Sequence, residues 1–459
     1  MKNNEKIKIV LIALAARILF CILGWQTSYI ESYEHNISIV YQRSAYLISF
    51  GYGYMQTTPP SPAYTDLMSE MDHVRFGEDF NSKIDSVGLY QFEQYPPGWS
   101  LLAAGLFKIT HVPVPFIMQA AGILIDLISL LLFIKVFETF FSIKSIRIAS
   151  LIYSIYPPVL AIALSMTPDS WMIFFIALIL YIYFIIYPKK KYRAIILIGI
   201  ITGVATLFRP DFLFITAFIF LGDLFLHRNF IEFFKIQVSI YVLAFLTLMP
   251  WGLFNLKHNN HFDITSTALG GTLVTGFATY NDPLNLGPSD IDRQEEVKKV
   301  GIEHPFEKDG DRYFKKQYFS YIKAYPDYYL KTILYRTVFF LAPPHIWGIE
   351  QHDNIKYSDL QNQGHLISSI QIILQKYAVN LISALLALLG NLAILILFWK
   401  NKKQPLPVIM FFIGLCIYLS HVFIYMTPVY VMPLVFFQLI ALTDWWLKYR
   451  QTKTKRHPV

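Results

Sequence analysis

Charged residues and cysteines are both scarce in this chain. Only 15% of its 459 residues are charged, whereas a soluble domain carries about a quarter, so the composition argues against a soluble globular protein. Cys21 and Cys416 each lie inside an apolar run, which excludes a disulfide framework and a cysteine metal site. The glycine-rich stretch ALGGTLVTG (268–276) follows no strand pattern and opens no βαβ unit, which excludes a nucleotide-binding loop.

In place of charge, the chain has ten long apolar runs. Several reach the roughly 20 residues that cross about 30 Å of hydrocarbon as a helix. The runs cover residues 8–26, 115–134, 148–164, 170–187, 194–208, 211–226, 236–254, 378–399, 406–424 and 428–447. We therefore predict an all-α polytopic membrane protein with about ten transmembrane helices, forming one membrane-embedded domain over residues 1–459. The first run follows MKNNEKIK without a small-residue cleavage site, so we expect it to be retained as a helix.

Six short basic clusters indicate the orientation. Cytoplasmic loops carry an excess of lysine and arginine, and with ten crossings all six clusters fall on one side. They lie at residues 2–8, 144–147, 188–193, 227–235, 400–403 and 448–457. We therefore predict that both termini lie in the cytoplasm. The small number of cysteines and the compact outer loops favour a bacterial plasma (inner) membrane. The net charge of +8 is explained by this topology, so we expect membrane lipids and no nucleic acid as partners.

The orientation holds only if residues 331–349 do not cross the membrane. This segment contains Lys331, Arg336 and a Pro-Pro pair, so we predict a buried or re-entrant helix on the outer side. Two long segments then lie outside the membrane, residues 27–97 with nine acidic and three basic residues, and residues 255–375. We expect short amphipathic or re-entrant helices in both, and we place the chemistry on this outer face.

An ordered series of motifs lies on that face. In chain order the motifs are ESYEHN (31–36), SAYLISFGYGYMQ (44–56), QYPPGW (94–99), IYPP (155–158), MTPDSW (166–171), LFRPDF (207–212), MPWGLFN (249–255) and YMTPVYVMP (425–433). Together they resemble the integral-membrane C-type glycosyltransferases, especially the bacterial branch related to protein O-mannosyltransferases and lipid A aminoarabinose transferases. The resemblance covers most of the chain, although each motif alone has little specificity.

The resemblance implies transfer of a sugar from a polyprenyl-phosphate donor to a lipid, glycan or protein acceptor at the outer membrane face. It implies no certain cofactor and leaves a divalent metal ion open. Five histidines in the second outer segment lack the close spacing of metal ligands, so we predict no metal site from them. Relatives often have an arginine where this chain has Phe254, so Lys257 is the substitute candidate for a phosphate-binding cation there.

Such a transfer needs a base for the acceptor hydroxyl and positive charge at the leaving phosphate. Glu34, directly after the first apolar run and within the family's acidic motif, is the first candidate for the base, and Glu31 is the second. The alternative is that both are solvated loop carboxylates. In this family the first outer loop lies over the active site, and QYPPGW would be the corner where it re-enters the membrane.

Three further residues are candidates for the site. Asp169 sits at a helix start, where it either stabilises the helix dipole or serves as a second carboxylate that orients the acceptor or a metal. Arg209, at the membrane edge, either pairs with Asp211 or binds the donor phosphate, because an intramembrane arginine needs a partner. Arg336 likewise either has a structural partner or binds the donor phosphate.

Two other functions use similar components. A transporter or flippase of lipid-linked sugars would keep its charges in broken helices near the bilayer midplane, whereas the motifs here gather at one end of the predicted spans. A polysaccharide polymerase or ligase uses similar donors but transfers longer glycans, and the sequence does not separate it from a transferase of single sugars.

Overall fold

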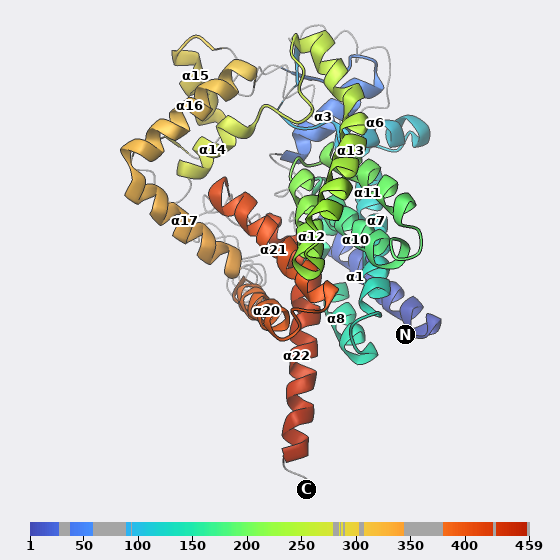
Figure 1. The fold of residues 1–459 in the computed structure, drawn as a ribbon. Coiled ribbons are helices and arrows are strands. Elements are labelled where there is room, and N and C mark those ends of the chain that lie inside the picture. Colours follow the sequence, from blue (N-terminus) through green and yellow to red (C-terminus); the bar gives the residue numbers. More distant parts are fainter. Residues whose placement is uncertain are drawn as a thin grey trace, which may run out of the picture.

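The computed structural model describes residues 1–26, 37–57, 89–92, 94–278, 284, 286–287, 290–302, 307–343, 380–425 and 428–456. Most of these residues are helical (Figure 1), and the strands among them form a single two-stranded sheet. The predicted helical membrane class is confirmed. The small sheet was not predicted.

All ten apolar runs form helices. In chain order they are α1 (Asn3–Gln26), α7 (Val114–Phe137), α8 (Ile143–Ile155) with α9 (Pro157–Leu164), α10 (Asp169–Tyr181) with the π-helix η1 (Ile182–Ile186), α11 (Lys191–Thr206), α12 (Phe212–His227), α13 (Phe230–Asn259), α20 (Asn380–Lys400), α21 (Pro405–Phe423), and the 3-10 helix η4 (Pro428–Leu434) with α22 (Val435–Arg456).

By length and composition, six stretches of the described residues are able to cross a membrane. They are α7, α10 with η1, α13, α20, α21 and most of η4 with α22. The bent pair α8 and α9 would make a seventh. The chain is therefore a multi-pass membrane protein, while the predicted count of about ten crossings is not confirmed.

The third apolar run is broken in the middle. Helices α8 and α9 meet at an angle of 59°, because Pro157 and Pro158 have no N–H to continue the hydrogen bonds of α8. In an unbroken helix the carbonyl of Ser154 would accept from residue 158. Here it accepts instead from Nη1 of Arg17, at 3.1 Å. An arginine of α1 thus satisfies a carbonyl that the prolines expose.

Arg17 is also one member of a buried polar triad. Its Nε donates to Oδ2 of Asp126 in α7 at 2.7 Å, and the Tyr153 hydroxyl donates to Oδ1 of the same carboxylate at 2.7 Å. Arg17 is fully buried, so the pairing expected of an arginine inside a span is present. The triad joins α1, α7 and α8.

The described residues of the segment 27–97, predicted to lie outside, form a small aromatic layer with the helix that follows. The layer contains α3 (Ile37–Ser49), strands β1 (Met55–Thr57) and β2 (Leu89–Gln91), which pair antiparallel with Met55 opposite Gln91, and the following helix α6 (Gly98–Thr110). Gly51 and Gly53 both adopt positive φ, 92° and 86°, in the turn that leads into β1. Tyr54 follows the turn and packs edge-on against Trp251 of α13.

Four helices of the second outer segment form a unit of their own, here called the outer unit. They are α14 (Leu269–Ala278), α15 (Asp290–Lys299), α16 (Lys308–Ala324) and α17 (Pro326–Leu341). Phe277, Phe314 and Tyr318 belong to its core. The backbone N–H of Gly270 donates to Oδ1 of Asp311 at 2.7 Å, so a carboxylate of α16 occupies the start of α14.

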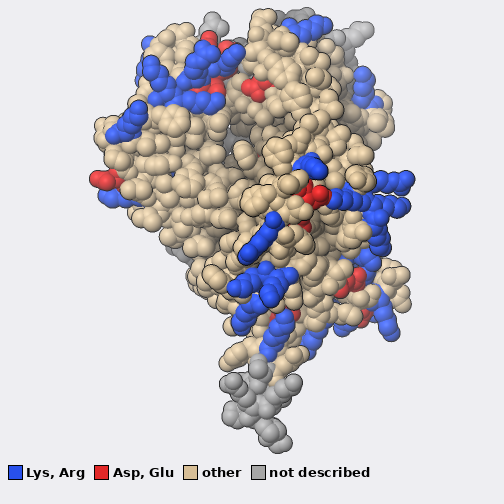
Figure 2. Space-filling view, viewed as in Figure 1, with Lys and Arg blue, Asp and Glu red and all other residues tan. Residues whose placement is uncertain are grey.

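In Figure 1, α14 to α16 lie at the same end of the molecule as α3 and α6, and α17 descends from them toward α20. Figure 2 shows basic side chains at the end that carries α15 and α16, and again around the opposite ends of α20 and α22. Exposed residues at these two ends include Lys299, Lys308, Lys402 and Lys403. Between the two ends the left part of this face is largely uncharged, as expected where hydrocarbon surrounds a protein, whereas further basic and acidic side chains lie at mid-height on its right.

Candidate functional site

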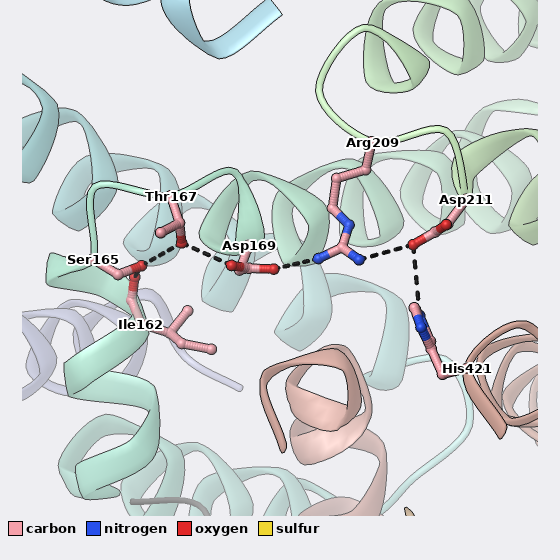
Figure 3. A network of polar contacts seen from close by, with 7 residues as sticks. All are labelled: Ile162, Ser165, Thr167, Asp169, Arg209, Asp211 and His421. Atoms are coloured by element: carbon pink, nitrogen blue, oxygen red, sulfur yellow. Dashed lines mark hydrogen bonds and ion pairs between the residues drawn. The ribbon is translucent and has the colours of Figure 1, made fainter. Parts of the chain in front are cut away.

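Asp169 and Arg209 meet at the centre of a polar network (Figure 3). Asp169 begins α10, and Arg209 and Asp211 lie in the loop between α11 and α12. Nη1 of Arg209 donates to Oδ1 of Asp169, and Nη2 donates to Oδ2 of Asp211 at 3.0 Å. The guanidinium therefore bridges two carboxylates that come from different parts of the chain.

The network continues on both sides of the bridge. The Thr167 hydroxyl donates to Oδ2 of Asp169 at 2.8 Å, and the hydroxyls of Thr167 and Ser165 lie 2.9 Å apart. On the other side, Nε2 of His421 in α21 lies 3.5 Å from Oδ2 of Asp211. Ser165 and Thr167 lie in the short loop between α9 and α10, so the break after α8 sets where Asp169 is presented.

Two tyrosines cover the charged groups. The guanidinium carbon of Arg209 lies 4.4 Å from the ring centroid of Tyr430, within the range of a cation–π contact. The His421 ring stacks on the same tyrosine, with centroids 4.1 Å apart. Tyr41 of α3 is close enough to interact electrostatically with Arg209, Asp169 and Tyr430.

The turn QYPPGW packs directly against the loop that carries Arg209. The N–H of Gly98 donates to the carbonyl of Leu207 at 2.7 Å. A Cβ at Gly98 would lie 2.6 Å from that carbonyl oxygen, so only glycine permits the approach. The rings of Tyr95 and Trp99 flank Tyr41, with centroids 5.2 and 5.5 Å away. The turn thus joins the first outer segment to the polar network.

Electrostatics keep Arg209 charged. Burial lowers the pKa of Arg209, but Asp211 and Asp169 outweigh burial, and the net shift is upward. Burial raises the pKa of the Tyr41 hydroxyl, so it stays protonated. The side chains of Asp169, Arg209 and Asp211 keep 12, 14 and 26% of their surface exposed. Solvent therefore reaches part of the charged groups of this network.

The other candidate residues lie elsewhere. Glu31 and Glu34 fall outside the described residues, so their prediction stays a prediction. Lys257 is exposed in the last turn of α13. Arg336 is fully buried in α17, where its Nη1 donates to the carbonyl of Val422 at 2.9 Å. Of the predicted site residues that are described, the structure brings together Asp169 and Arg209.

Sequence reasoning missed His421 and gave Tyr430 no role. Tyr430 lies in the motif YMTPVYVMP, so its neighbourhood was marked, but the contact with Arg209 was not. His421 is a lone histidine in an apolar run, and no local pattern distinguishes it. Within the described residues, no three His, Cys, Asp or Glu side chains are arranged to hold a metal ion.

Part of this chain matches a known protein family. The model of the dolichyl-phosphate-mannose-protein mannosyltransferase family matches residues 94–254. Two solved oligosaccharyltransferase structures from Archaeoglobus fulgidus share the fold. One is the archaeal enzyme AglB in complex with an inhibitory peptide and a dolichol-phosphate, with a TM-score of 0.51 and 12% identity over 99% of this chain and 52% of its own. The other is tethered with an acceptor peptide containing the NVT sequon via a disulfide bond, with a TM-score of 0.52 and 12% identity over 100% of this chain and 51% of its own.

The family match supports the membrane C-type glycosyltransferase superfamily, and the two archaeal structures show a shared fold. The chain spans about half the length of the two archaeal proteins, and no curated protein matches its sequence. The mannosyltransferase family match contains QYPPGW, Asp169, Arg209 and Asp211, whereas His421 and Tyr430 lie outside it. The family match and the polar network therefore overlap in the half of the site that α10 and the loop after α11 contribute.

Proposed function

We propose that this protein transfers a sugar, a hexose or a pentose, from a polyprenyl-phosphate-linked donor to an acceptor at the outer face of the plasma membrane. The observation that carries the proposal is Arg209, a permanently charged group that two carboxylates hold in place and that still keeps 14% of its surface exposed. A fixed cation in a largely buried site is what the leaving phosphate of a lipid-linked sugar requires.

In the proposed reaction the acceptor oxygen attacks the anomeric carbon, and the bond from that carbon to the phosphate oxygen breaks. The polyprenyl phosphate leaves with the electron pair, and a carboxylate takes the proton of the acceptor hydroxyl. Arg209 has five N–H donors, of which the ion pairs to Asp169 and Asp211 use two. Its other donors face the phosphate in this proposal, and no charge has to be moved into the site during the reaction.

The remaining roles are assigned as follows. Glu34 is the proposed base, with Glu31 as the second candidate, since both follow α1 in the first outer segment. Asp169 fixes Arg209 and is the second carboxylate. Lys257 and Arg336 are weaker phosphate candidates, because the first lies exposed at the end of α13 and the second is fully buried.

One of the archaeal structures holds a dolichol-phosphate and a peptide. By analogy, we propose that this protein also binds a lipid phosphate, as the product that remains after the donor has lost its sugar. The proposed acceptor is a lipid, a glycan or a protein. Titration of the activity with divalent metal ions tests whether the transfer needs one.

The test uses purified protein in lipid nanodiscs with synthetic polyprenyl-phosphate hexose and pentose. Release of polyprenyl phosphate is measured for the wild type, Arg209→Ala and Arg147→Ala. Arg147 is the matched control, because it is a paired but exposed arginine bound to Glu5 in α1. We expect release that Arg209→Ala abolishes and Arg147→Ala preserves. In a parallel assay with vesicles, movement of the intact donor across the membrane without release of polyprenyl phosphate would instead favour a flippase. Release of polyprenyl phosphate together with glycan products of increasing length would favour a polymerase.

A further inference from the structure

The last turn of α21 is held by side chains of the outer unit. The final carbonyls of a helix have no partner within the helix, and in α21 they are bound from outside. Arg336 donates to the carbonyl of Val422 at 2.9 Å. The hydroxyls of Tyr318 and Tyr329 lie 3.1 and 3.4 Å from the carbonyl oxygen of Phe423 and 3.0 Å from each other. Each hydroxyl has one proton, so one of the pair donates to the other and the pair together binds the carbonyl. Side chains of α16 and α17 therefore bind two consecutive carbonyls of α21.

Helix α14 approaches the same place. A Cβ at Gly276 would lie 2.1 Å from the carbonyl oxygen of Ile424 and 2.9 Å from Nη2 of Arg336. Ile424 itself packs against the apolar core of the outer unit. The segment at the end of α21 is thus seated in the outer unit by backbone, polar and apolar contacts together.

The same turn reaches the candidate site in the other direction. His421 directly precedes Val422 and is 5% exposed. Its Nε2 lies 3.5 Å from Oδ2 of Asp211, and Asp211 accepts from Arg209. Because consecutive residues of one helical turn move together, the position of the carbonyls at 422 and 423 sets the position of the His421 ring.

We propose that Tyr318, Tyr329 and Arg336 are positioning residues that fix Arg209 through His421 and Asp211. The inference rests on the proposed role of Arg209 at the donor phosphate. It assigns Arg336 a task other than direct phosphate binding. It also makes the seating of the outer unit a condition for a competent donor site, so that the second outer segment and the donor site are coupled through one turn of α21.

The first test is kinetic and uses hydroxyl deletions. The double variant Tyr318→Phe/Tyr329→Phe removes both hydroxyls at the carbonyl of Phe423 and keeps the rings. Tyr328→Phe is the matched control, because its hydroxyl donates to a carbonyl within the outer unit, that of Phe277, at 3.2 Å. Loss of one neutral hydrogen bond to this carbonyl changes an equilibrium by about 2- to 10-fold. We expect the donor KM to rise by that factor in the double variant and to stay unchanged in the control.

A double-mutant cycle separates positioning from general stability. If the hydroxyls act through His421, the double variant adds no further change in donor KM when His421 is already replaced by Ala. Independent, additive effects would overturn the inference. Tyr318→Phe alone repeats both comparisons with a smaller perturbation should the double variant not fold.

A second readout does not depend on turnover. Hydrogen exchange of the backbone amides of the loop that carries Arg209, residues 207–209 and 211, should accelerate in the double variant and not in Tyr328→Phe. Acceleration confined to the end of α21 would overturn the inference. A wild-type protein that releases no polyprenyl phosphate would count against the proposed function alone, since the exchange comparison would still decide the coupling.

Discussion

Replacing Asp169 by Asn tests whether this carboxylate holds Arg209. The amide keeps the size of the side chain and an oxygen for Thr167, but it removes the charge that faces the guanidinium. Loss of a charge-assisted hydrogen bond costs about 1.5–3 kcal/mol. Removing one partner of a fully buried pair costs about 3–5 kcal/mol, but Arg209 keeps Asp211 and 14% of its surface exposed, so we adopt the lower range.

At 1.4 kcal/mol for each tenfold change, that range corresponds to a fall of about 10- to 150-fold in kcat/KM for the donor. The assay is steady-state release of polyprenyl phosphate, with the melting temperature recorded for each variant. Asp327→Asn is the matched control, because Asp327 also lies in the first turn of a helix but is exposed. It should lose at most the helix-dipole contribution of about 0.3–1 kcal/mol in stability, with no change in donor kinetics.

Combining Asp169→Asn with Arg209→Ala completes the test. If Asp169 acts only by fixing Arg209, the combined variant should be no worse than Arg209→Ala alone. Additive losses with a raised acceptor KM would show that Asp169 contacts the acceptor itself. Kinetics and melting temperature equal to those of the wild type in Asp169→Asn would refute the reasoning, since the ion pair would then hold nothing in place.

Three other predictions follow from the same structure and sequence. Glu34→Gln should lower transfer by about 10²- to 10⁴-fold, the usual size of a general-base contribution, while donor binding persists; full activity there with loss in Glu31→Gln would move the role to Glu31. Gly98→Ala should lower stability by about 1–3 kcal/mol, as overpacking does, and should also impair donor turnover because the added Cβ displaces the carbonyl of Leu207; an unchanged melting temperature would contradict the close approach. Cysteines at Lys190 and Lys308 should react with an impermeant reagent from opposite sides of the membrane, the second from outside, and labelling of Lys308→Cys from the cytoplasm alone would reverse the topology.

The sequence predicts where the long apolar helices of this fold lie, but it does not predict where they bend. Apolar runs locate every described α-helix of more than 18 residues, because a segment that meets hydrocarbon must be both helical and apolar. They do not reveal bends, so residues 148–164 read as one span although Pro157 and Pro158 break it. The small sheet was also missed, since strands of three residues have too short a pattern to detect.

Some residues of the candidate site could likewise be predicted from local sequence, and others could not. Asp169 was chosen because it sits at a helix start, and Arg209 because an arginine at the membrane edge needs a partner. Asp211 was the expected partner of Arg209 because it lies two residues away, whereas the contact with Asp169 spans 40 residues and follows only from the packing of α10 beside α11. The contribution of His421 depends on how α21 ends against the outer unit, which no local pattern encodes.

The triad of Arg17, Asp126 and Tyr153 has a consequence for biosynthesis. The sequence predicts that α1 crosses the membrane. For such a helix an arginine near the middle raises the free energy of insertion by about 2.5–3.5 kcal/mol, and the carboxylate that compensates Arg17 is made 109 residues later. Until α7 leaves the ribosome, α1 carries an uncompensated charge, and once α7 arrives it carries an acid that needs the same partner. The two helices therefore depend on each other for stable insertion, and the third member, Tyr153, arrives with α8, just ahead of the break that leads to Asp169.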